Sequence, residues 1–137
     1  MRNFQTLDKV VVDSDTGIIY LSTASDTETG APKVSMRREG GYVAISASYG
    51  PLEIALRPRF TEVARTLSRL RPVAGLQTTR QVGTGQAYVA FGLQNDGVLV
   101  MRPTIVGDAT GLISFNLLLT DEVRQVVFDW LPAEDVE

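Results

Sequence analysis

The chain contains neither cysteine nor histidine among its 137 residues. Without cysteine it forms no disulfide and offers no thiolate to a metal ion. Without histidine it lacks the commonest general base, the commonest metal ligand, and every nucleophile triad that depends on an imidazole. We therefore expect a non-enzymatic protein, with no catalytic residues and no cofactor.

Long apolar runs are also missing. No stretch approaches the roughly 18 apolar residues that a membrane-spanning helix needs, and residues 1–8 lack the apolar segment of a secretory signal. We expect a cytoplasmic protein with no membrane partner. Apolar residues make up 44% of the chain and charged residues 21%. That composition and length suit one globular domain, spanning residues 1–137, with its own core.

Charge is unevenly distributed along the chain, although the net charge is only −3. Residues 1–30 carry a net charge of −3, residues 31–80 carry +6, and residues 81–137 carry −6. A basic middle between acidic flanks indicates either an anion-binding surface or two regions that attract one another. Scattered surface charge with no role is the third interpretation.

A helical pattern occurs twice, sixty residues apart. The first copy runs from Arg59 to Pro72 and the second from Asp121 to Pro132. Each is apolar at helical spacing, and each ends at a proline, which does not continue a helix. The two copies share the Glu-Val pair at 62–63 and 122–123 and the closing proline. Thr120 is a residue type that caps helix N-termini, so we expect the second helix to begin there.

Short strands are predicted elsewhere, from alternating or β-branched segments between turn residues. They are residues 9–13, 18–22, 33–38, 42–49, 52–57, 86–93, 98–102 and 112–119. Each helix thus follows a set of antiparallel strands, and its apolar stripe is expected to pack on the sheet of its own unit. We predict an α+β fold of two strand-rich repeats with internal pseudo-symmetry. Repeat 1 covers about 9–72, a connector covers 73–80, and repeat 2 covers about 81–132.

This layout resembles the Whirly and Pur-type group of single-stranded nucleic-acid-binding folds, in which a curved antiparallel sheet and one following helix occur twice. The resemblance covers Lys9 to Leu131. It rests on topology and length, and it assigns no individual residue. It implies binding of single-stranded DNA or RNA without catalysis.

Sheets that bind single strands present aromatic rings to the bases and cationic side chains to the phosphates. Residues of both kinds lie on or beside the predicted strands, and Arg65 and Arg69 lie one turn apart on the first helix, away from its apolar stripe. The candidate nucleic-acid-binding residues are Tyr20, Lys33, Arg37, Arg38, Tyr42, Arg57, Arg65, Arg69, Tyr88 and Arg102. In the structural alternative, the arginines are solvated or paired with acidic residues and the tyrosines cover the edge of the core.

One motif suggests an enzyme. Asp15-Thr16-Gly17 follows an apolar strand and is similar to the catalytic motif of retroviral-type aspartic proteases, in which two carboxylates share a proton across a dimer axis. The same residue types are typical of a hairpin turn, in which aspartate accepts backbone hydrogen bonds and glycine takes a positive φ. We favour the turn and keep the peptidase as the last alternative. A calcium loop would need a glutamate where Ala24 stands, so no metal site is predicted.

Features of the second helix and of the strand edges favour self-association. Phe128 lies off the apolar stripe, whereas Trp130 belongs to it and is expected in the core. An exposed aromatic ring and unpaired strand edges both invite contact with another chain. We therefore expect a homo-oligomer. A protein-interaction or self-assembling subunit, in which the basic middle of one chain meets the acidic end of another, is the main alternative to nucleic-acid binding.

Overall fold

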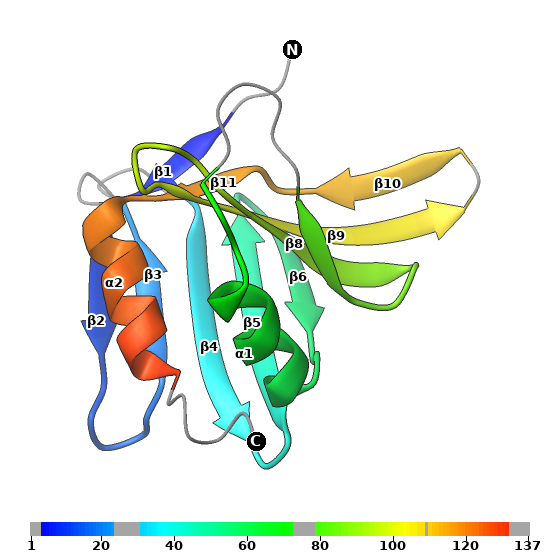
Figure 1. The fold of residues 1–137 in the computed structure, drawn as a ribbon. Helices are drawn as coiled ribbons and strands as arrows, with labels where there is room; N and C mark the ends of the chain where they lie inside the picture. The colour runs from blue at the N-terminus through cyan, green and yellow to red at the C-terminus, as the bar shows by residue number, and fades with distance from the viewer. Residues whose placement is uncertain (1–3, 24–30, 73–78, 109, 132–137) are drawn as a thin grey trace.

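The computed structural model contains two β-sheets and two helices, and it describes residues 4–23, 31–72, 79–108 and 110–131 (Figure 1). The first unit is a five-stranded antiparallel sheet, the first sheet, followed by one helix. Its elements are β2 (Lys9–Val12), β3 (Ile19–Ser22), β4 (Lys33–Glu39), β5 (Tyr42–Tyr49), β6 (Leu52–Leu56) and α1 (Phe60–Ser68). The strands follow one another in the sheet in the order of the sequence.

The second unit repeats this plan, which confirms the predicted α+β fold of two sheet-then-helix units. Its sheet, the second sheet, has the strand order β1-β11-β9-β8-β7, and β10 also pairs with β9. Its elements are β7 (Arg80–Gly83), β8 (Ala87–Leu93), β9 (Leu99–Asp108), β10 (Gly111–Ser114), β11 (Leu117–Leu119) and α2 (Asp121–Trp130). The N-terminal strand β1 (Gln5–Leu7) lies parallel to β11.

Several strand boundaries differ from the prediction. β1 and β7 were not predicted, because three or four residues carry too little alternation to be recognised. β9 extends to Asp108, and the predicted strand 112–119 is two strands, β10 and β11. The interruption lies opposite Pro103, which has no backbone N–H to give to a neighbouring strand; its carbonyl still accepts a hydrogen bond from the N–H of Phe115 at 3.1 Å.

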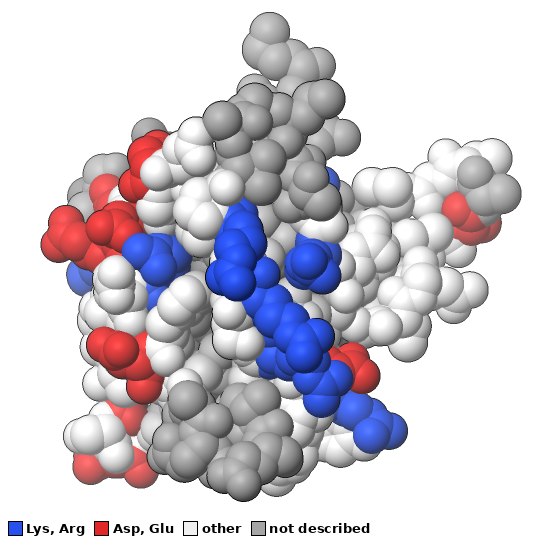
Figure 2. Space-filling model, in the orientation of Figure 1, with Lys and Arg blue, Asp and Glu red and all other residues white. Residues whose placement is uncertain are grey.

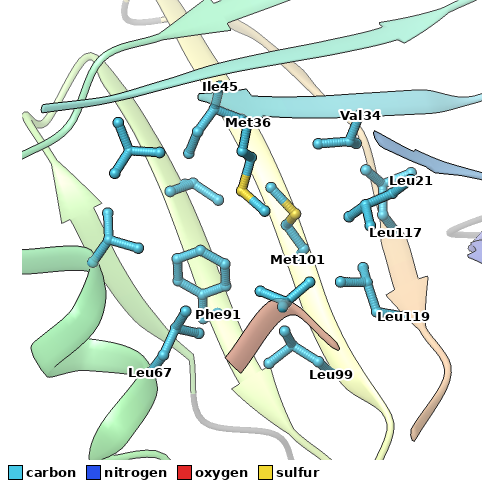
Figure 3. Packing of buried hydrophobic residues seen from close by; sticks show 14 of the residues in the cluster. Leu21, Val34, Met36, Ile45, Leu67, Phe91, Leu99, Met101, Leu117 and Leu119 are labelled. Atoms are coloured by element: carbon cyan, nitrogen blue, oxygen red, sulfur yellow. The ribbon is translucent and has the colours of Figure 1, made fainter. Parts of the chain in front are cut away.

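A single cluster of buried apolar side chains lies between the inner faces of the two sheets. Met36 of the first sheet faces Met101 of the second, and Leu21 lies near Leu117 (Figure 3). Strand alternation explains this arrangement, because every second residue of β3, β4 and β5 points inward. Leu52 is exposed although its strand alternates in the same way, and it occupies the first position of β6.

Both helices lie on the inner side of the first sheet and help to close the core (Figure 1). α1 contacts β5 and also β7 of the second sheet, whereas α2 contacts β11 and also β2 and β3 of the first sheet. Each helix thus packs on the sheet of its own unit, as expected, and also on the other sheet, which was not predicted. Each helix has a wide enough apolar stripe to touch both sheets.

The aligned positions of the two helices are buried alike. Val63 and Val123 are each buried, as are Leu67 and Val127, at the predicted offset of sixty residues. Thr120 caps α2 as expected, since its hydroxyl accepts a hydrogen bond from the N–H of Val123 at 3.3 Å. α1 ends at Ser68, well before the predicted proline, and Pro132 and residues 73–78 of the connector lie outside the described residues.

The two aromatic residues of α2 are both half-buried. Trp130 packs against the edge of the core cluster without being fully buried. Its indole N–H donates a hydrogen bond to the carbonyl oxygen of Gly17 at 2.9 Å, which ties α2 to the β2–β3 turn. Phe128 was expected to be exposed, but it packs against the core cluster and under the guanidinium of Arg124. No helix in the described part of the chain is both long and apolar enough to cross a membrane.

The pairing of β1 yields a stability prediction. Leu7 is completely buried and pairs with Leu119, so it joins the N-terminus to the second unit. Leu7→Ala should lower the free energy of unfolding by about 2–5 kcal/mol, because it leaves a cavity in the core. Val11, which is 51% exposed on β2, provides the control: Val11→Ala should change stability by no more than about 0.5 kcal/mol. Urea unfolding followed by Trp130 fluorescence measures both, and equal effects would contradict the role of β1.

Candidate nucleic-acid interface

Both described helices lie on the inner side of the first sheet, so neither of them covers its outer face (Figure 1). Alternation places small residues at its centre. Ser35 pairs with Ser46, and Ser46 pairs with Ala55, so three neighbouring strands have short side chains in one row. Tyr20 lies at the end of that row, opposite Ser35. The sequence pattern thus gives a low floor with larger side chains at its margins.

Two hollows occupy this outer face, with volumes of about 450 and 350 Å³. Both are lined by Ser35 and Ser46, so they adjoin at the centre of the sheet. Tyr20 and Lys33 line the smaller hollow, and Arg37 lines the larger one. The short side chains of the floor account for the depth, since nothing larger fills the space above the central strands.

The hollows continue onto the second sheet. β6 contacts β8 and β9, so the sheets meet along this edge. A third hollow of about 200 Å³ at the junction shares Arg57 with the first and is also lined by Tyr88. A fourth, of about 380 Å³, shares Tyr88 and is lined by Arg102. We call these four adjoining hollows the outer trough.

Small residues also line the trough on the second sheet. Gly83 is one of them, and its φ of 128° suits glycine. A Cβ atom there would lie 2.5 Å from the carbonyl oxygen of Ala87. At the far end the hydroxyls of Thr104 and Ser114 lie 3.0 Å apart. The trough therefore offers a shallow, mainly uncharged floor along its whole length.

The charges of the trough are partly compensated. Glu39 forms ion pairs with Arg37 and with Arg57, whose Nε lies 3.1 Å from a Glu39 carboxylate oxygen. The hydrogen bond from Arg37 lowers the pKa of Glu39 below its ordinary value of 4.5, and the positive charges of both arginines lower it further. Glu53 accepts a hydrogen bond from the hydroxyl of Ser46 at 2.8 Å. The four cations of the trough thus outnumber its two carboxylates.

A second basic surface lies on the other side of the first sheet. Blue side chains form a stripe across α1 in Figure 2. The exposed arginines on α1 and on the segments beside it are Arg59, Arg65, Arg69, Arg71 and Arg80, and we call them the basic stripe. None of the five forms an ion pair with a described residue. The apolar stripe of α1 turns Arg65, which lies between its buried positions, toward solvent.

The structure brings together six of the ten residues predicted to bind nucleic acid. Those lining the outer trough are Tyr20, Lys33, Arg37, Arg57, Tyr88 and Arg102. Tyr42 does not line the trough but lies beside it. The centroid of its ring is 5.2 Å from the guanidinium carbon of Arg57.

The three other candidates lie elsewhere. Arg65 and Arg69 belong to the basic stripe on the opposite side of the sheet. Arg38 alternates with Arg37 and so points inward, where its guanidinium lies 3.7 Å from the ring centroid of Phe60. Strand alternation alone separates Arg38 from Arg37, so this distinction was available in the sequence. The other arginines of the basic stripe were visible in the sequence, but the sequence alone does not show that they lie on one surface, because that depends on the packing of α1 beside β7.

The Asp-Thr-Gly motif forms the turn between β2 and β3. The carboxylate of Asp13 accepts a hydrogen bond from the N–H of Asp15 at 2.9 Å, and Gly17 has a φ of 75°. The hydroxyl of Thr16 accepts a hydrogen bond from the N–H of Ile18 at 3.3 Å. Turn chemistry thus accounts for Thr16 and Gly17 of the motif and for Asp13 before it. Across the described ranges, no group of three or more carboxylates is placed to hold a metal ion.

No protein-family model, curated protein or solved structure matches this chain.

The ion pairs of Glu39 predict a pH dependence. Since its pKa is lowered in the folded state, the pairing stabilises the protein above the unfolded-state pKa, and this contribution is lost as the pH falls through the lower, folded-state pKa. Arg37→Gln should raise the pKa of Glu39 toward 4.5, whereas Lys33→Gln should leave it unchanged. Carboxyl chemical shifts followed by nuclear magnetic resonance during an acid titration measure both. An unchanged pKa in Arg37→Gln would contradict the pairing.

Proposed function

We propose that this protein is a non-enzymatic module that binds single-stranded nucleic acid in the outer trough. One observation carries the proposal. Aromatic and cationic residues of both units, which were selected in the sequence as candidates for nucleic-acid binding, line a single series of adjoining hollows. The series runs from the Tyr20 end of the first sheet to Arg102 of the second. A long, narrow site of this kind suits an extended polymer better than a compact ligand.

The side chains of the trough have the properties that a single strand requires. Tyr20 is 44% exposed and offers a ring on which a base can stack, and Tyr88 lies in the lining of the second sheet. Lys33, Arg37 and Arg57 stand at the margins of the low floor, where they can contact phosphates. Stacking and phosphate contacts both tolerate any base sequence, so we propose binding with little sequence preference.

The carboxylates of the trough moderate this binding. Glu39 already forms ion pairs with Arg37 and Arg57, so a phosphate that contacts these arginines competes with the Glu39 carboxylate. We therefore propose modest affinity rather than tight binding. The same pairing holds the two guanidinium groups in place before a ligand arrives, which lowers the entropy lost on binding.

Charge reversal at Arg37 tests where the strand binds. Arg37→Glu should weaken the binding of a labelled single-stranded oligonucleotide of any sequence, because a phosphate contact is replaced by repulsion. For the unmodified protein, the slope of log K against log salt should be about −2 to −3, since each single-strand phosphate contact contributes about 0.7. Fluorescence anisotropy at several salt concentrations measures both quantities.

Arg65→Glu is the matched control, because it makes the same charge change on the basic stripe. It should leave affinity nearly unchanged. If Arg65→Glu weakens binding as much as Arg37→Glu does, the strand does not bind in the trough. If the unmodified protein binds no oligonucleotide even at low salt, the proposed function is wrong.

Replacing Tyr20 tests the stacking contribution. Tyr20→Ala should weaken oligonucleotide binding by about 5- to 150-fold, because stacking on an aromatic side chain contributes about 1–3 kcal/mol per base. Tyr20→Phe keeps the ring and should bind like the unmodified protein. Tyr20 is partly exposed, so neither change is expected to unfold the sheet, and circular dichroism checks this. Equal affinities for the alanine and phenylalanine variants would argue against stacking at this position.

A further inference from the structure

Two strands of the second sheet extend beyond the body of the protein as a hairpin. Its residues are Thr104–Asp108 of β9 and Gly111–Ser114 of β10, and we call it the arm (Figure 1). The arm projects because β9 is ten residues long, whereas β11 pairs only with Leu99–Met101 and β8 only with Leu99–Ile105. Among the residues that the structure describes, β10 pairs only with β9. Its other edge therefore presents backbone N–H and C=O groups to solvent.

β10 gives the arm two exposed apolar side chains. Leu112 is 61% exposed and Ile113 is 47% exposed. They pair with Val106 and Ile105 of β9, so apolar residues lie on both faces of the hairpin. Figure 2 shows the arm as almost entirely uncharged, in contrast to the rest of that view. Its one charged residue is Asp108, at the tip.

Natural proteins commonly protect exposed strand edges with charged side chains, which oppose pairing with another chain. Two other outer strands follow this rule, since β2 begins with Lys9 and β7 begins with Arg80. β10 contains only glycine, leucine, isoleucine and serine. A register shift lies between Gly111 and Leu112, so the regular part of the edge is Leu112–Ser114.

We propose that β10 is a homodimer interface, in which the β10 edges of two copies pair antiparallel across a two-fold axis. Such an interface places each residue opposite itself or a near neighbour from the other copy. A charged side chain on such a strand would lie opposite the same charge of the other copy. The side chains of β10 carry no charge, so the same side chains of two copies can lie opposite one another without repulsion. The second copy is therefore the occupant that this edge fits. The two second sheets join into one continuous sheet.

This arrangement also connects the two outer troughs. Leu112 and Ser114 line the last hollow of the trough, at the β10 edge. Pairing of the two edges brings these ends together, so the hollows of two copies adjoin. This consequence rests on the proposed function of the trough, but the dimer itself does not.

The dimer is tested by measuring molar mass with light scattering over a range of protein concentrations. The unmodified protein should be a dimer, and Ile113→Lys should be a monomer, because it places a charge opposite its own copy. Val11→Lys is the matched control, since Val11 is also an exposed apolar strand residue, on the edge that already carries Lys9. It should remain a dimer. A monomeric unmodified protein, or an unaltered dimer in Ile113→Lys, would overturn the proposal.

The chain has no cysteine, so single cysteines give a second and independent measurement. Leu112→Cys, Ile113→Cys and Ser114→Cys are each exposed to a mild oxidant, and at least one should form a disulfide-linked dimer. A disulfide requires Cα atoms within about 7 Å, so the residue that crosslinks reports the register. Val11→Cys should not crosslink. If Ile113→Lys fails to fold, as judged by circular dichroism, the crosslinks decide; no crosslink at any of the three positions would refute the interface.

The salt dependence of dimer formation distinguishes this interface from an alternative, charged contact between two copies. An apolar strand pairing should persist as salt is added, whereas contact between the basic stripe and an acidic surface should loosen. A dimer that dissociates with salt would therefore overturn the proposal in favour of the charged contact. Oligonucleotide titration of the monomeric variant keeps the two proposals apart. Retained binding supports the function of the trough whatever the oligomeric state, and loss of binding in a folded monomer would show that the trough requires the dimer.

Discussion

The whole structure depends on one shared core between two sheets. The inner faces of the two sheets are apolar, and burying them against each other leaves the outer face of β4 and β5 mainly to polar and small residues. The two helices are drawn into the same core, each touching strands of both sheets. Because both helices of the described part of the chain occupy the inner side, neither covers the outer face of the first sheet. The outer trough is therefore a consequence of core burial as much as of the residues that line it.

Much of this architecture was predictable from the sequence, for reasons that differ between elements. The alternation of Val34 and Met36 with Ser35 and Arg37 defined β4 and its two faces. Thr120 marked the start of α2. Short elements could not be found in this way: β1 has three residues, and its pairing with β11 depends on contacts across more than a hundred positions. The packing of α2 on β2 and β3 was missed for the same reason, because a helix pattern reveals an apolar stripe but not the surface that covers it.

The candidate site was predictable to a similar degree. Chemistry singled out Tyr20 and Tyr88, but nothing in the local sequence places two tyrosines 68 positions apart along one series of hollows. That placement requires β6 to lie against β8 and β9. Helix periodicity did separate Arg65 and Arg69 from the apolar stripe, yet it gave no sign that they would lie across the sheet from Arg37. Side-chain chemistry is thus local information, whereas the grouping of side chains into one surface is set by the contacts between sheets.

Comparison of the two helices shows which features the repeated plan fixes. At the offset of sixty residues, the buried positions keep their character: Val63 corresponds to Val123, and Leu67 to Val127. The exposed positions do not, since Arg65 corresponds to Gln125 and Arg69 to Asp129. Packing against the shared core constrains the first pair of positions and leaves the second pair free to differ. The charges at these exposed positions are therefore independent of the fold, and so is the uncharged edge of β10. Features that the fold does not require can therefore differ between the units. The arm belongs to the second unit alone. The basic stripe combines arginines on and beside α1 with Arg80 of β7, and the trough also spans both units.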